Sequence, residues 1–312
     1  GFVFTKPDGF SAPRVAVTVT DPEENTSEFS NHVVPGSTAT SISVAYNFDT
    51  DPASVLQIIA NNNDLPWVAT NGNPDTGGFL ALSHPVNFQN THLVFPDHEP
   101  GKAVTAFTFE CDVRLGNSTG VRPADGFSIS FARAGDPVLL LMDSNPGRGY
   151  AGDTMSGFSG GENGSLPETG TTTGIAISFD TWSGNALPDG ADIEGIIVRV
   201  DNKTELRLSL PTRNGACGDV TSLQTGPRDA DYWAGGGNPY APGSWRTLCW
   251  QPLSVALDEQ GQLTVRYKNS VLLDKFQTSY FPSVGRLILA GRTGGGNENT
   301  HIDNIRISTT QP

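Results

Sequence analysis

Apolar and polar residues alternate along most of this chain in short runs, which is the pattern of half-buried β-strands. The clearest run has Ile175, Ile177 and Phe179 at alternate positions and ends at Asp180. A second run, Ile193–Val200, is rich in β-branched residues, which favour strands. Gly, Pro, Asn and Asp recur about once every dozen residues between such runs, which is typical of β-sandwiches.

The same alternation predicts further strands, and we expect residues 41–312 to form one sandwich. These further strands are expected at 41–49, 79–82, 91–95, 105–115, 126–132, 205–210, 253–257, 263–267, 271–276, 287–290 and 302–307. The sequence shows no long helical periodicity, and the segment 52–61 is its only modest candidate for a helix. The pattern therefore predicts an all-β fold.

Residues 1–40 differ from the rest and are expected to form an extended N-terminal β arm. In the segment 15–22 valine alternates with Ala or Thr until an Asp-Pro pair ends the strand. The segment 15–30 resembles the last strands of immunoglobulin-like modules in large bacterial surface proteins. Two strands alone do not form a stable sheet in water. We expect the arm either to pack on the main domain or to join the sheet edge of another copy of the chain.

Composition supports many short strands and argues against two classes of partner. The 312 residues include 36 Gly and 22 Pro, and 36% are hydrophobic, which suits strands joined by frequent turns. The net charge of −14 argues against binding to a nucleic-acid backbone, because such binding needs clustered Lys and Arg. No apolar run approaches the ~20 residues of a membrane span, so none is expected.

The three cysteines allow one disulfide and leave the pairing open. Cys217 and Cys249 flank a segment rich in Gly, Pro and Trp and could close it as a disulfide. Cys111 lies in a strand-like run, where a buried free thiol is the expectation. A disulfide, abundant loops and an acidic composition together favour a secreted or cell-surface location.

Two long stretches, 133–170 and 214–250, interrupt the strand pattern. Irregular segments of this length in a compact domain are often functional. The second stretch carries five aromatic residues: Tyr232, Trp233, Tyr240, Trp245 and Trp250. Their rings either stack on sugar rings or pack as a lid over the sandwich.

An acidic loop joins the two clearest strands. It contains Asp180, Asn185, Asp189 and Asp192 together with many backbone carbonyls. Ca²⁺ takes six to eight oxygen ligands of this kind, although Asp and Asn are also ordinary turn formers. The loop is therefore either a calcium site or a polar hairpin loop.

Two short motifs suggest a family. The run 124–132, Ala-Asp-Gly-Phe-Ser-Ile-Ser-Phe-Ala, followed by Ile-Ser-Phe-Asp-Thr-Trp at 177–182, resembles L-type (legume) lectins and, more broadly, the concanavalin-A-like lectin/glucanase superfamily. The ending, 290–305, resembles lectin-like jelly-roll domains of large secreted bacterial proteins. The resemblance covers about residues 41–310 and implies a concanavalin-A-like jelly-roll β-sandwich that binds carbohydrate.

The resemblance also implies site residues. Asp125 matches the sugar-binding Asp of L-type lectins, which often follows a cis peptide bond. Asp180, the carbonyl of Trp182, Asn185 and Asp189 match the calcium ligands, with Asn185 one position late.

One departure from the lectin pattern limits the metal content. Ser178 stands where those lectins have a Glu that helps to bind a transition metal. A single Ca²⁺, rather than a pair of metal ions, is therefore expected.

The sequence thus favours an extracellular, non-catalytic domain that binds a glycan or polysaccharide. The expected ligand contacts are Asp125, Asn185, Trp182, Trp233 and Tyr240. One alternative is a structural subunit of an extracellular filament or surface layer, assembled with copies of itself through the N-terminal arm.

A second alternative is a polysaccharide hydrolase or lyase, which would use Asp229, Asp231 or His301. Glycosidase chemistry is disfavoured because no second carboxylate accompanies Asp180 in its strand, whereas retaining hydrolysis needs two. Arg292 is expected to form a structural ion pair with Asp303 rather than to serve catalysis.

Overall fold

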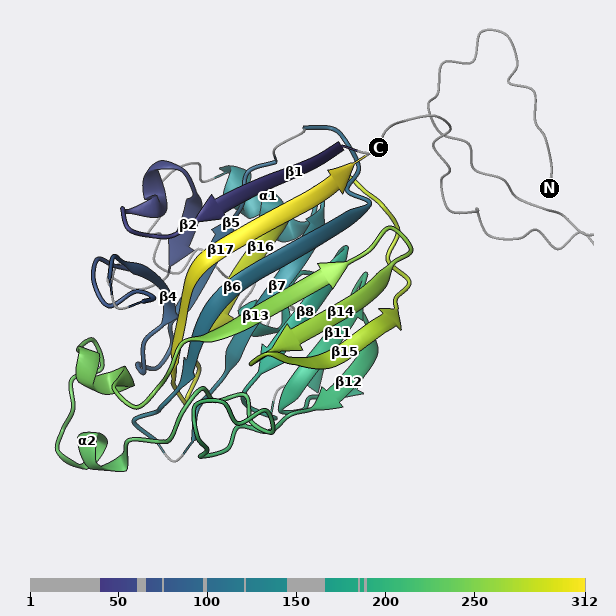
Figure 1. Ribbon diagram of the computed structural model, residues 1–312. Coiled ribbons are helices and arrows are strands. Elements are labelled where there is room, and N and C mark those ends of the chain that lie inside the picture. Colours follow the sequence, from purple (N-terminus) through teal and green to yellow (C-terminus); the bar gives the residue numbers. More distant parts are fainter. Residues whose placement is uncertain are drawn as a thin grey trace, which may run out of the picture.

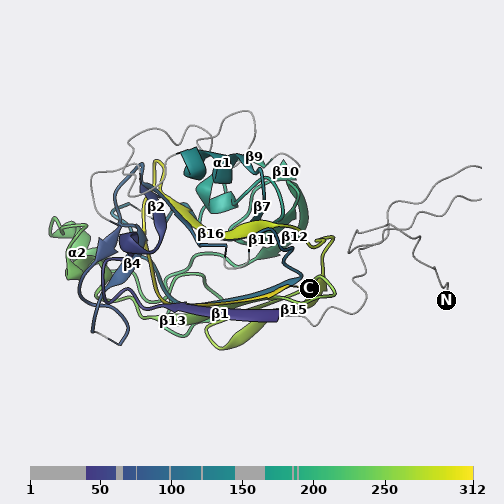
Figure 2. The same ribbon diagram turned by 90° about the horizontal axis from the view of Figure 1, so that it is seen from above.

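In a computed structural model the chain folds into two antiparallel sheets that pack face to face (Figures 1 and 2). The structure describes residues 40–60, 66–74, 76–97, 100–120, 122–144, 166–184, 186–187 and 190–311. Apart from Thr40, the expected N-terminal arm lies outside these residues, so its role in packing or self-association stays a prediction. The all-β sandwich predicted from the alternating pattern is confirmed.

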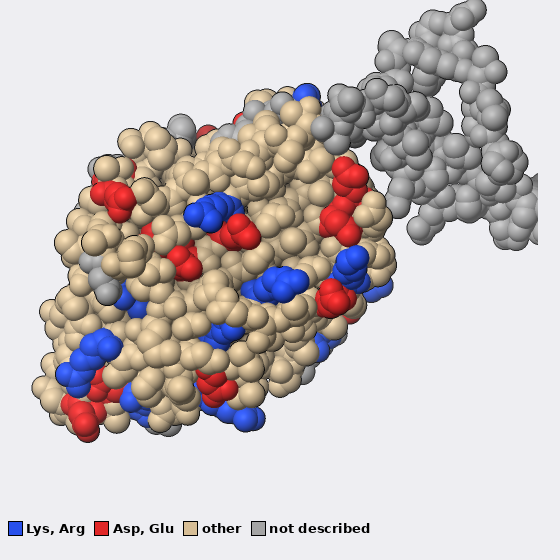
Figure 3. Space-filling view, viewed as in Figure 1, with Lys and Arg blue, Asp and Glu red and all other residues tan. Residues whose placement is uncertain are grey.

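The first sheet has eight strands in the order β15-β14-β13-β6-β17-β4-β3, with β1 also paired to β17. Its strands are β1 (Thr40–Tyr46), β3 (Trp67–Val68), β4 (Phe79–Ser83), β6 (Ala106–Gly116), β13 (Gln251–Leu257), β14 (Gln262–Tyr267), β15 (Ser270–Gln277) and β17 (Asn299–Gln311). Acidic and basic side chains are interspersed over its outer face (Figure 3).

The second sheet has seven strands in the order β12-β11-β8-β7-β16-β5-β2. Its strands are β2 (Gln57–Ala60), β5 (Asn90–Val94), β7 (Gly126–Arg133), β8 (Ile175–Asp180), β11 (Gly195–Val200), β12 (Lys203–Ser209) and β16 (Gly285–Arg292). A small hairpin of β9 (Ala186–Leu187) and β10 (Gly190–Ala191) lies between β8 and β11 in the sequence.

The core fills the space between the sheets with inward-facing alternate residues. Phe107 and Phe109 of β6 and Phe127 and Phe131 of β7 are all buried there. The Phe127 ring stacks on that of Phe179 at a centroid distance of 4.8 Å. Truncation of one such buried ring to Ala typically costs about 3–5 kcal/mol, so this layer contributes strongly to the stability of the domain.

The outer face of the seven-stranded sheet is also covered, which the alternating pattern did not predict. All six residues of β8 are buried, because the 3₁₀ turn η3 (Pro167–Thr169) packs on β7, β8 and β16. Small residues on that face allow the close approach, and the Ser178 hydroxyl donates to the Glu168 carbonyl. The turn η3 brings Glu168 into the interior of the molecule.

Helix α1 (Pro137–Ser144) covers another part of the same face and lies within a stretch expected to be irregular. The Asp136 carboxylate accepts a hydrogen bond from the Val138 amide at 2.9 Å and so starts the helix. Figure 2 shows α1 on the side of the sheet that faces away from the other sheet. Buried apolar residues join the helix to the sheet: Val138, Leu139, Met142, Ile59, Val94, Ala132, Ile288 and Ala290.

The helix expected at 52–61 is wrong. Pro52–Ser54 forms only a short 3₁₀ turn, η1, and Gln57–Ala60 forms strand β2. The strand forms because it pairs with β5 along the sheet edge and buries Ile58 and Ile59, so tertiary pairing outweighs the local propensity. No helix in the described part of the chain is long and apolar enough to cross a membrane.

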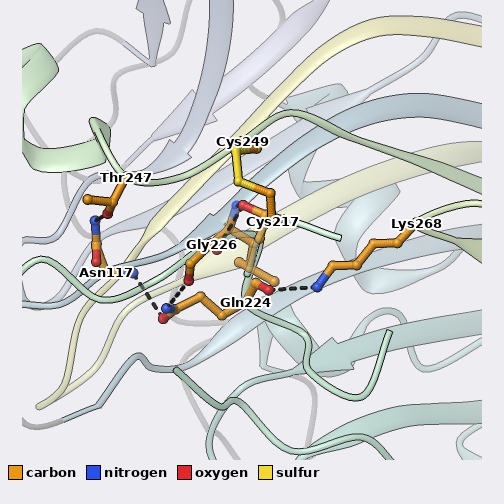
Figure 4. The surroundings of a disulfide bond; sticks show 9 residues. Asn117, Cys217, Gln224, Gly226, Thr247, Cys249 and Lys268 are labelled. Atoms are coloured by element: carbon orange, nitrogen blue, oxygen red, sulfur yellow. Dashed lines mark hydrogen bonds between the residues drawn. A yellow bond between two sulfur atoms is a disulfide. The ribbon is translucent and has the colours of Figure 1, made fainter. Parts of the chain in front are cut away.

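The segment between β12 and β13 contains a disulfide that joins Cys217 to Cys249 (Figure 4). Cys111 is free and buried. Lys268 also fixes this segment, because its ammonium donates to the carbonyls of Asp219, Ser222 and Gln224 at 2.6–2.8 Å. Burial lowers the pKa of Lys268 to about 8.

Candidate functional site

Strand register brings the chemistry-bearing residues to one end of the seven-stranded sheet. Arg292 at the end of β16 is paired with Asn90 of β5 on one side and Gly126 of β7 on the other. Gly126 is paired in turn with Asp180 at the end of β8. The four residues form one row across four strands, so the segments that leave the strands beyond this row share one end of the sandwich.

Asp125 enters this end through a turn that requires glycine beside it. Gly126 has φ +119°, and a Cβ atom there would lie 2.3 Å from the Phe179 carbonyl oxygen. Asp125 is held at both backbone groups: its amide donates to the Arg292 carbonyl at 3.2 Å, and its carbonyl accepts from the Thr181 amide at 3.1 Å. The Ala124–Asp125 peptide bond is cis.

The Asp125 carboxyl is buried against a cation and a glycine loop. Its Oδ2 atom lies 3.4 Å from Nη2 of Arg292 and has no hydrogen-bond donor. Burial raises the pKa of Asp125, while Arg292 and a hydrogen bond from the Gly294 amide lower it. A Cβ atom on Gly294 would lie 2.7 Å from Oδ2, so the loop can approach the carboxyl only as glycine.

Arg292 is itself held by a second carboxylate, Glu168, which is fully buried. Its Nε and Nη2 atoms bind the two oxygens of Glu168 at 2.8 and 2.6 Å. Burial raises the pKa of Glu168 to about 6 despite this partner. The expected pair of Arg292 with Asp303 is wrong, because Asp303 lies in β17 of the other sheet and accepts from the amides of Asn73 and Asn304.

An open hollow of about 730 Å³ lies over the Asp125 carboxyl. Of the sequence-predicted ligand contacts, it brings together Asp125 and Trp182. The Arg122 guanidinium covers the Trp182 ring at 4.1 Å and binds Glu194 at 2.9 Å. The residues that line the hollow are Gly120, Arg122, Asp125, Trp182, Arg292, Gly294, Gly295 and Gly296.

Two residues before Trp182, which lines the hollow, the predicted calcium loop begins with the buried carboxylate of Asp180. The Oδ1 atom of Asp180 accepts from the Trp182 amide at 2.9 Å, and its Oδ2 atom is buried without a hydrogen-bond donor. Burial, then Asp192 and Glu168, raise the pKa of Asp180 well above its usual range. In the described part of the chain, no basic side chain makes a hydrogen bond with either oxygen.

Two of the four predicted calcium ligands, Asn185 and Asp189, lie outside the described residues. Within the described ranges, no group of three or more His, Cys, Asp or Glu side chains is placed to hold a metal ion. The donors that fit a hard cation here are the Asp180 and Asp192 carboxylates and the backbone carbonyl of Trp182. The buried Asp180 carboxyl, which has the Asp192 carboxyl beside it and no basic side chain in hydrogen-bond contact, is the observation that favours a cation at this position.

The sequence did not identify Glu168, Arg122 or Glu298 as parts of this end. Glu298 is buried, and one of its oxygens accepts from the Thr181 hydroxyl at 2.8 Å while the other has no donor. No local signal marks these residues, because each meets its partner across a long sequence separation. The triple glycine at 294–296 was the one visible signal for a loop that approaches another group closely.

The predicted loop aromatics Trp233 and Tyr240 are not among the residues that line the hollow. Tyr232 and Trp233 pack edge to face at 4.9 Å near the short helix α2 (Ala230–Ala234), and Tyr240 packs against His84. Trp245, in the 3₁₀ turn η4 (Pro242–Trp245), is buried against Phe79. This part of the segment is a lid over the sandwich, whereas the ligand roles of Trp233 and Tyr240 stay predictions.

Two of the three residues proposed for hydrolase or lyase chemistry, Asp229 and His301, have structural contacts. Asp229 caps α2 by accepting from the Tyr232 amide at 3.1 Å, and its carboxylate pairs with Arg246. His301 is fully buried and accepts from Nε of Arg114 at 3.1 Å. Neither residue lines the hollow, so these contacts give no support to a catalytic pair.

The solved structures that match this chain include lectins, and their sequence identity to it is low. Lectin UEA-II complexed with galactose matches with a TM-score of 0.52 at 14% identity, over 87% of this chain and 99% of that one. Basic winged bean lectin with Tn-antigen matches with 0.51 at 13% identity, over 88% and 100%. The metal-free exoplasmic/lumenal domain of VIP36 gives 0.46 at 16% identity, over 85% and 90%.

No protein-family model matches the sequence, and a search of curated proteins finds no relative. The two sheets and their lectin neighbours together show a concanavalin-A-like jelly-roll sandwich, the fold of the L-type lectins.

Proposed function

We propose that the chain is a lectin that binds a sugar in the hollow over Asp125. The observation that carries this proposal is a buried carboxylate whose Oδ2 atom has no hydrogen-bond donor and lies at the base of an open hollow. Sugar hydroxyls are donors, and a hydrogen bond to a charged acceptor contributes about 1.5–3 kcal/mol. The galactose and Tn-antigen complexes of the two lectins with the same fold support a carbohydrate ligand.

The hollow suits recognition better than cleavage. Glu168 fixes Arg292 through a bidentate contact, and Arg292 lies 3.4 Å from the Asp125 carboxylate, so the carboxylate is held in one position before a ligand arrives. Such preorganisation lowers the entropy lost on binding. The lining residues include one carboxylate, Asp125, whereas glycoside hydrolysis ordinarily uses two.

We further propose one Ca²⁺ beneath the hollow, held by Asp180, the Trp182 carbonyl, Asn185 and Asp189, with Asp192 as an additional donor. The ion would supply positive charge for the buried Asp180 carboxylate and would fix the loop that carries Trp182. Its role is positional. Asp125 itself accepts from the ligand.

We also propose that the protein acts outside the cell or in an oxidising lumen. The Cys217–Cys249 disulfide supports this location, because disulfides are rare where glutathione keeps thiols reduced.

The test is a glycan array that includes galactose-terminated and mannose-terminated glycans, probed in Ca²⁺ buffer with the wild type and Asp125→Asn. We expect the wild type to retain a defined glycan class and Asp125→Asn to bind it at least tenfold more weakly. Asp143→Asn is the matched control, because Asp143 is an exposed carboxylate that pairs with Arg286 at the opposite end of β16. An array without any retained glycan, or equal binding by Asp125→Asn and the wild type, would refute the proposal.

A further inference from the structure

One wall of the hollow over Asp125 is a cation. Arg122 lines the hollow, and its side chain is 39% exposed. An arginine carries five N–H donors and no acceptor. In the ranges that the structure describes, the only ion pair of Arg122 is the 2.9 Å contact of Nη1 with Glu194, and Nε is buried without a hydrogen-bond partner. The Nη1 and Nη2 groups therefore keep N–H donors that a ligand can reach.

The Arg122 guanidinium is held in place from two sides. Its carbon atom lies 4.1 Å from the centroid of the Trp182 ring. Its partner Glu194 is itself fixed, because the second Glu194 oxygen accepts from the Thr212 amide at 2.9 Å. The face of the Trp182 ring that Arg122 covers cannot stack on a sugar. At this wall, a ligand therefore meets a positive charge and hydrogen-bond donors in place of an aromatic face.

Arg292, the other cation that lines the hollow, is already bound by carboxylates. Its Nε and Nη2 atoms bind Glu168, and Nη2 also lies 3.4 Å from Asp125. Arg122 is thus the cation of the lining whose donors are less fully used. A guanidinium presents its donors as a planar fork that fits a carboxylate. Such charge-assisted hydrogen bonds are roughly twice as strong as neutral ones.

We propose that the hollow selects an acidic sugar, whose hydroxyl groups donate to Asp125 and whose carboxylate accepts from Arg122. This inference rests on the proposed function and names the class of glycan that the hollow takes. Two kinds of sugar carry this group, the hexuronic acids and the sialic acids. Arg122 determines the specificity, because the matching neutral sugar has no charge to pair with the guanidinium.

The experiment measures, by titration calorimetry in Ca²⁺ buffer, how much more tightly each acid binds than its own methyl ester. The ester keeps every ring hydroxyl and the carbonyl but removes the negative charge. The sugars are galacturonic acid, mannuronic acid, glucuronic acid and N-acetylneuraminic acid. We expect the wild type to bind at least one acid ten or more times more tightly than its ester. A preference among the first three sugars assigns the carboxylate to a hexuronic acid, and a preference for the fourth alone assigns it to a sialic acid.

Arg122→Gln removes the charge but keeps a side-chain amide that can donate to Glu194. It should bring the affinities of the acid and its ester to within about twofold of each other. Because the result is a ratio measured within one variant, a general loss of stability cannot imitate it. Arg266→Gln is the matched control, since Arg266 is an exposed arginine of β14 that does not line the hollow. This variant should keep the preference of the wild type.

The inference is overturned if Arg122→Gln keeps the preference, or if Arg266→Gln loses as much of it as Arg122→Gln does. It is also overturned if the wild type binds no acid more tightly than its ester. In that last case the glycan array decides the rest: a retained neutral glycan leaves the proposed function standing, and an array without any retained glycan removes both.

Discussion

Gly294 lies so close to Asp125 that a Cβ atom on the glycine would be 2.7 Å from the Oδ2 atom of the carboxylate. Real Cβ atoms do not approach other atoms this closely, so any larger residue must displace either the loop or the carboxylate. The contact therefore couples the glycine loop to the position of the atom proposed to bind sugar.

This contact predicts different results for alanine substitutions at two glycines. Gly294→Ala should weaken glycan binding at least tenfold, because the methyl group displaces the Asp125 carboxylate from its place beside Arg292. Gly218→Ala is the control, since Gly218 lies outside the hollow and a Cβ atom there meets nothing within 4 Å. Calorimetric titration with the glycan found on the array measures both variants. Equal affinities for the two variants would contradict the proposed role of the contact.

The buried pair of Arg292 with Glu168 predicts a large loss of stability when it is broken. Arg292→Met would leave the fully buried Glu168 carboxylate without its cation, which typically costs about 3–5 kcal/mol. Arg286→Met, in the same strand, removes only an exposed pair with Asp143 and should cost less than about 1 kcal/mol. Urea unfolding of the two variants gives the comparison. Similar midpoints would show that the buried pair is not structurally important.

The strands could be predicted because their signal is local. In β8, the apolar side chains of Ile175, Ile177 and Phe179 stand at alternate positions and are buried between the sheets. This period of two is enough to identify the segment as a strand. Asp125 could be identified from the short Ala-Asp-Gly motif. The glycine of that motif, Gly126, is needed because a Cβ atom there would collide with the Phe179 carbonyl.

Helix α1 and Glu168 could not be predicted, since both depend on distant partners. The run at 137–142 is almost wholly apolar and has no polar face to give a helical period. It forms a helix because Asp136 caps it and the seven-stranded sheet covers its apolar side chains. Glu168 lies 124 residues from Arg292 in the sequence, and only the 3₁₀ turn brings it to that partner.

His92 predicts a loss of stability in mild acid. Burial lowers its pKa to about 3 in the folded protein, whereas it titrates near 6.5 in an unfolded chain. Between these values the unfolded chain binds a proton that the folded chain does not, so the free energy of unfolding falls as the pH falls. The slope is about 1.4 kcal/mol per pH unit.

The measurement is urea unfolding of the wild type and His92→Gln at several pH values from 7.5 to 4.5. The pKa values of Glu168 and Asp303 are both raised to about 6, so these two acids increase the free energy of unfolding as the pH falls. This effect is the same in both proteins and cancels when their stabilities are subtracted. The stability advantage of the wild type should therefore shrink as the pH falls below 6.5. Parallel curves for the two proteins would contradict the prediction.

The proposed calcium site predicts a metal-dependent melting temperature. Ca²⁺ that binds only the folded protein at a hundredfold excess over its Kd stabilises it by about 2.7 kcal/mol. EDTA should remove this stabilisation, and Asp180→Asn should abolish it because the orphaned Oδ2 atom is lost. Asp125→Asn should keep the response, since Asp125 is assigned to the sugar. Calorimetric scans with identical melting temperatures in EDTA and in Ca²⁺ would refute the site.

The Cys217–Cys249 disulfide predicts that reduction weakens both the fold and the hollow. The bond closes a loop across a sequence separation of 32 residues, for which chain entropy gives about 3–4 kcal/mol of stabilisation. Within this loop the Arg228 guanidinium donates to the Gly120 carbonyl at the rim of the hollow. A looser segment therefore holds the rim less firmly and should raise the Kd for glycan as well as lower the melting temperature.

The double variant Cys217→Ser, Cys249→Ser tests this prediction against the wild type treated with dithiothreitol. Reductant should lower the melting temperature of the wild type to that of the variant and should leave the variant unchanged, because its one remaining cysteine, Cys111, is already a free thiol. Limited proteolysis should then cut first between Cys217 and Cys249, where the segment forms no strand and is held in part by side-chain contacts such as those of Lys268. If the protease cuts first elsewhere and the double variant binds glycan with full affinity, the disulfide does not support the hollow.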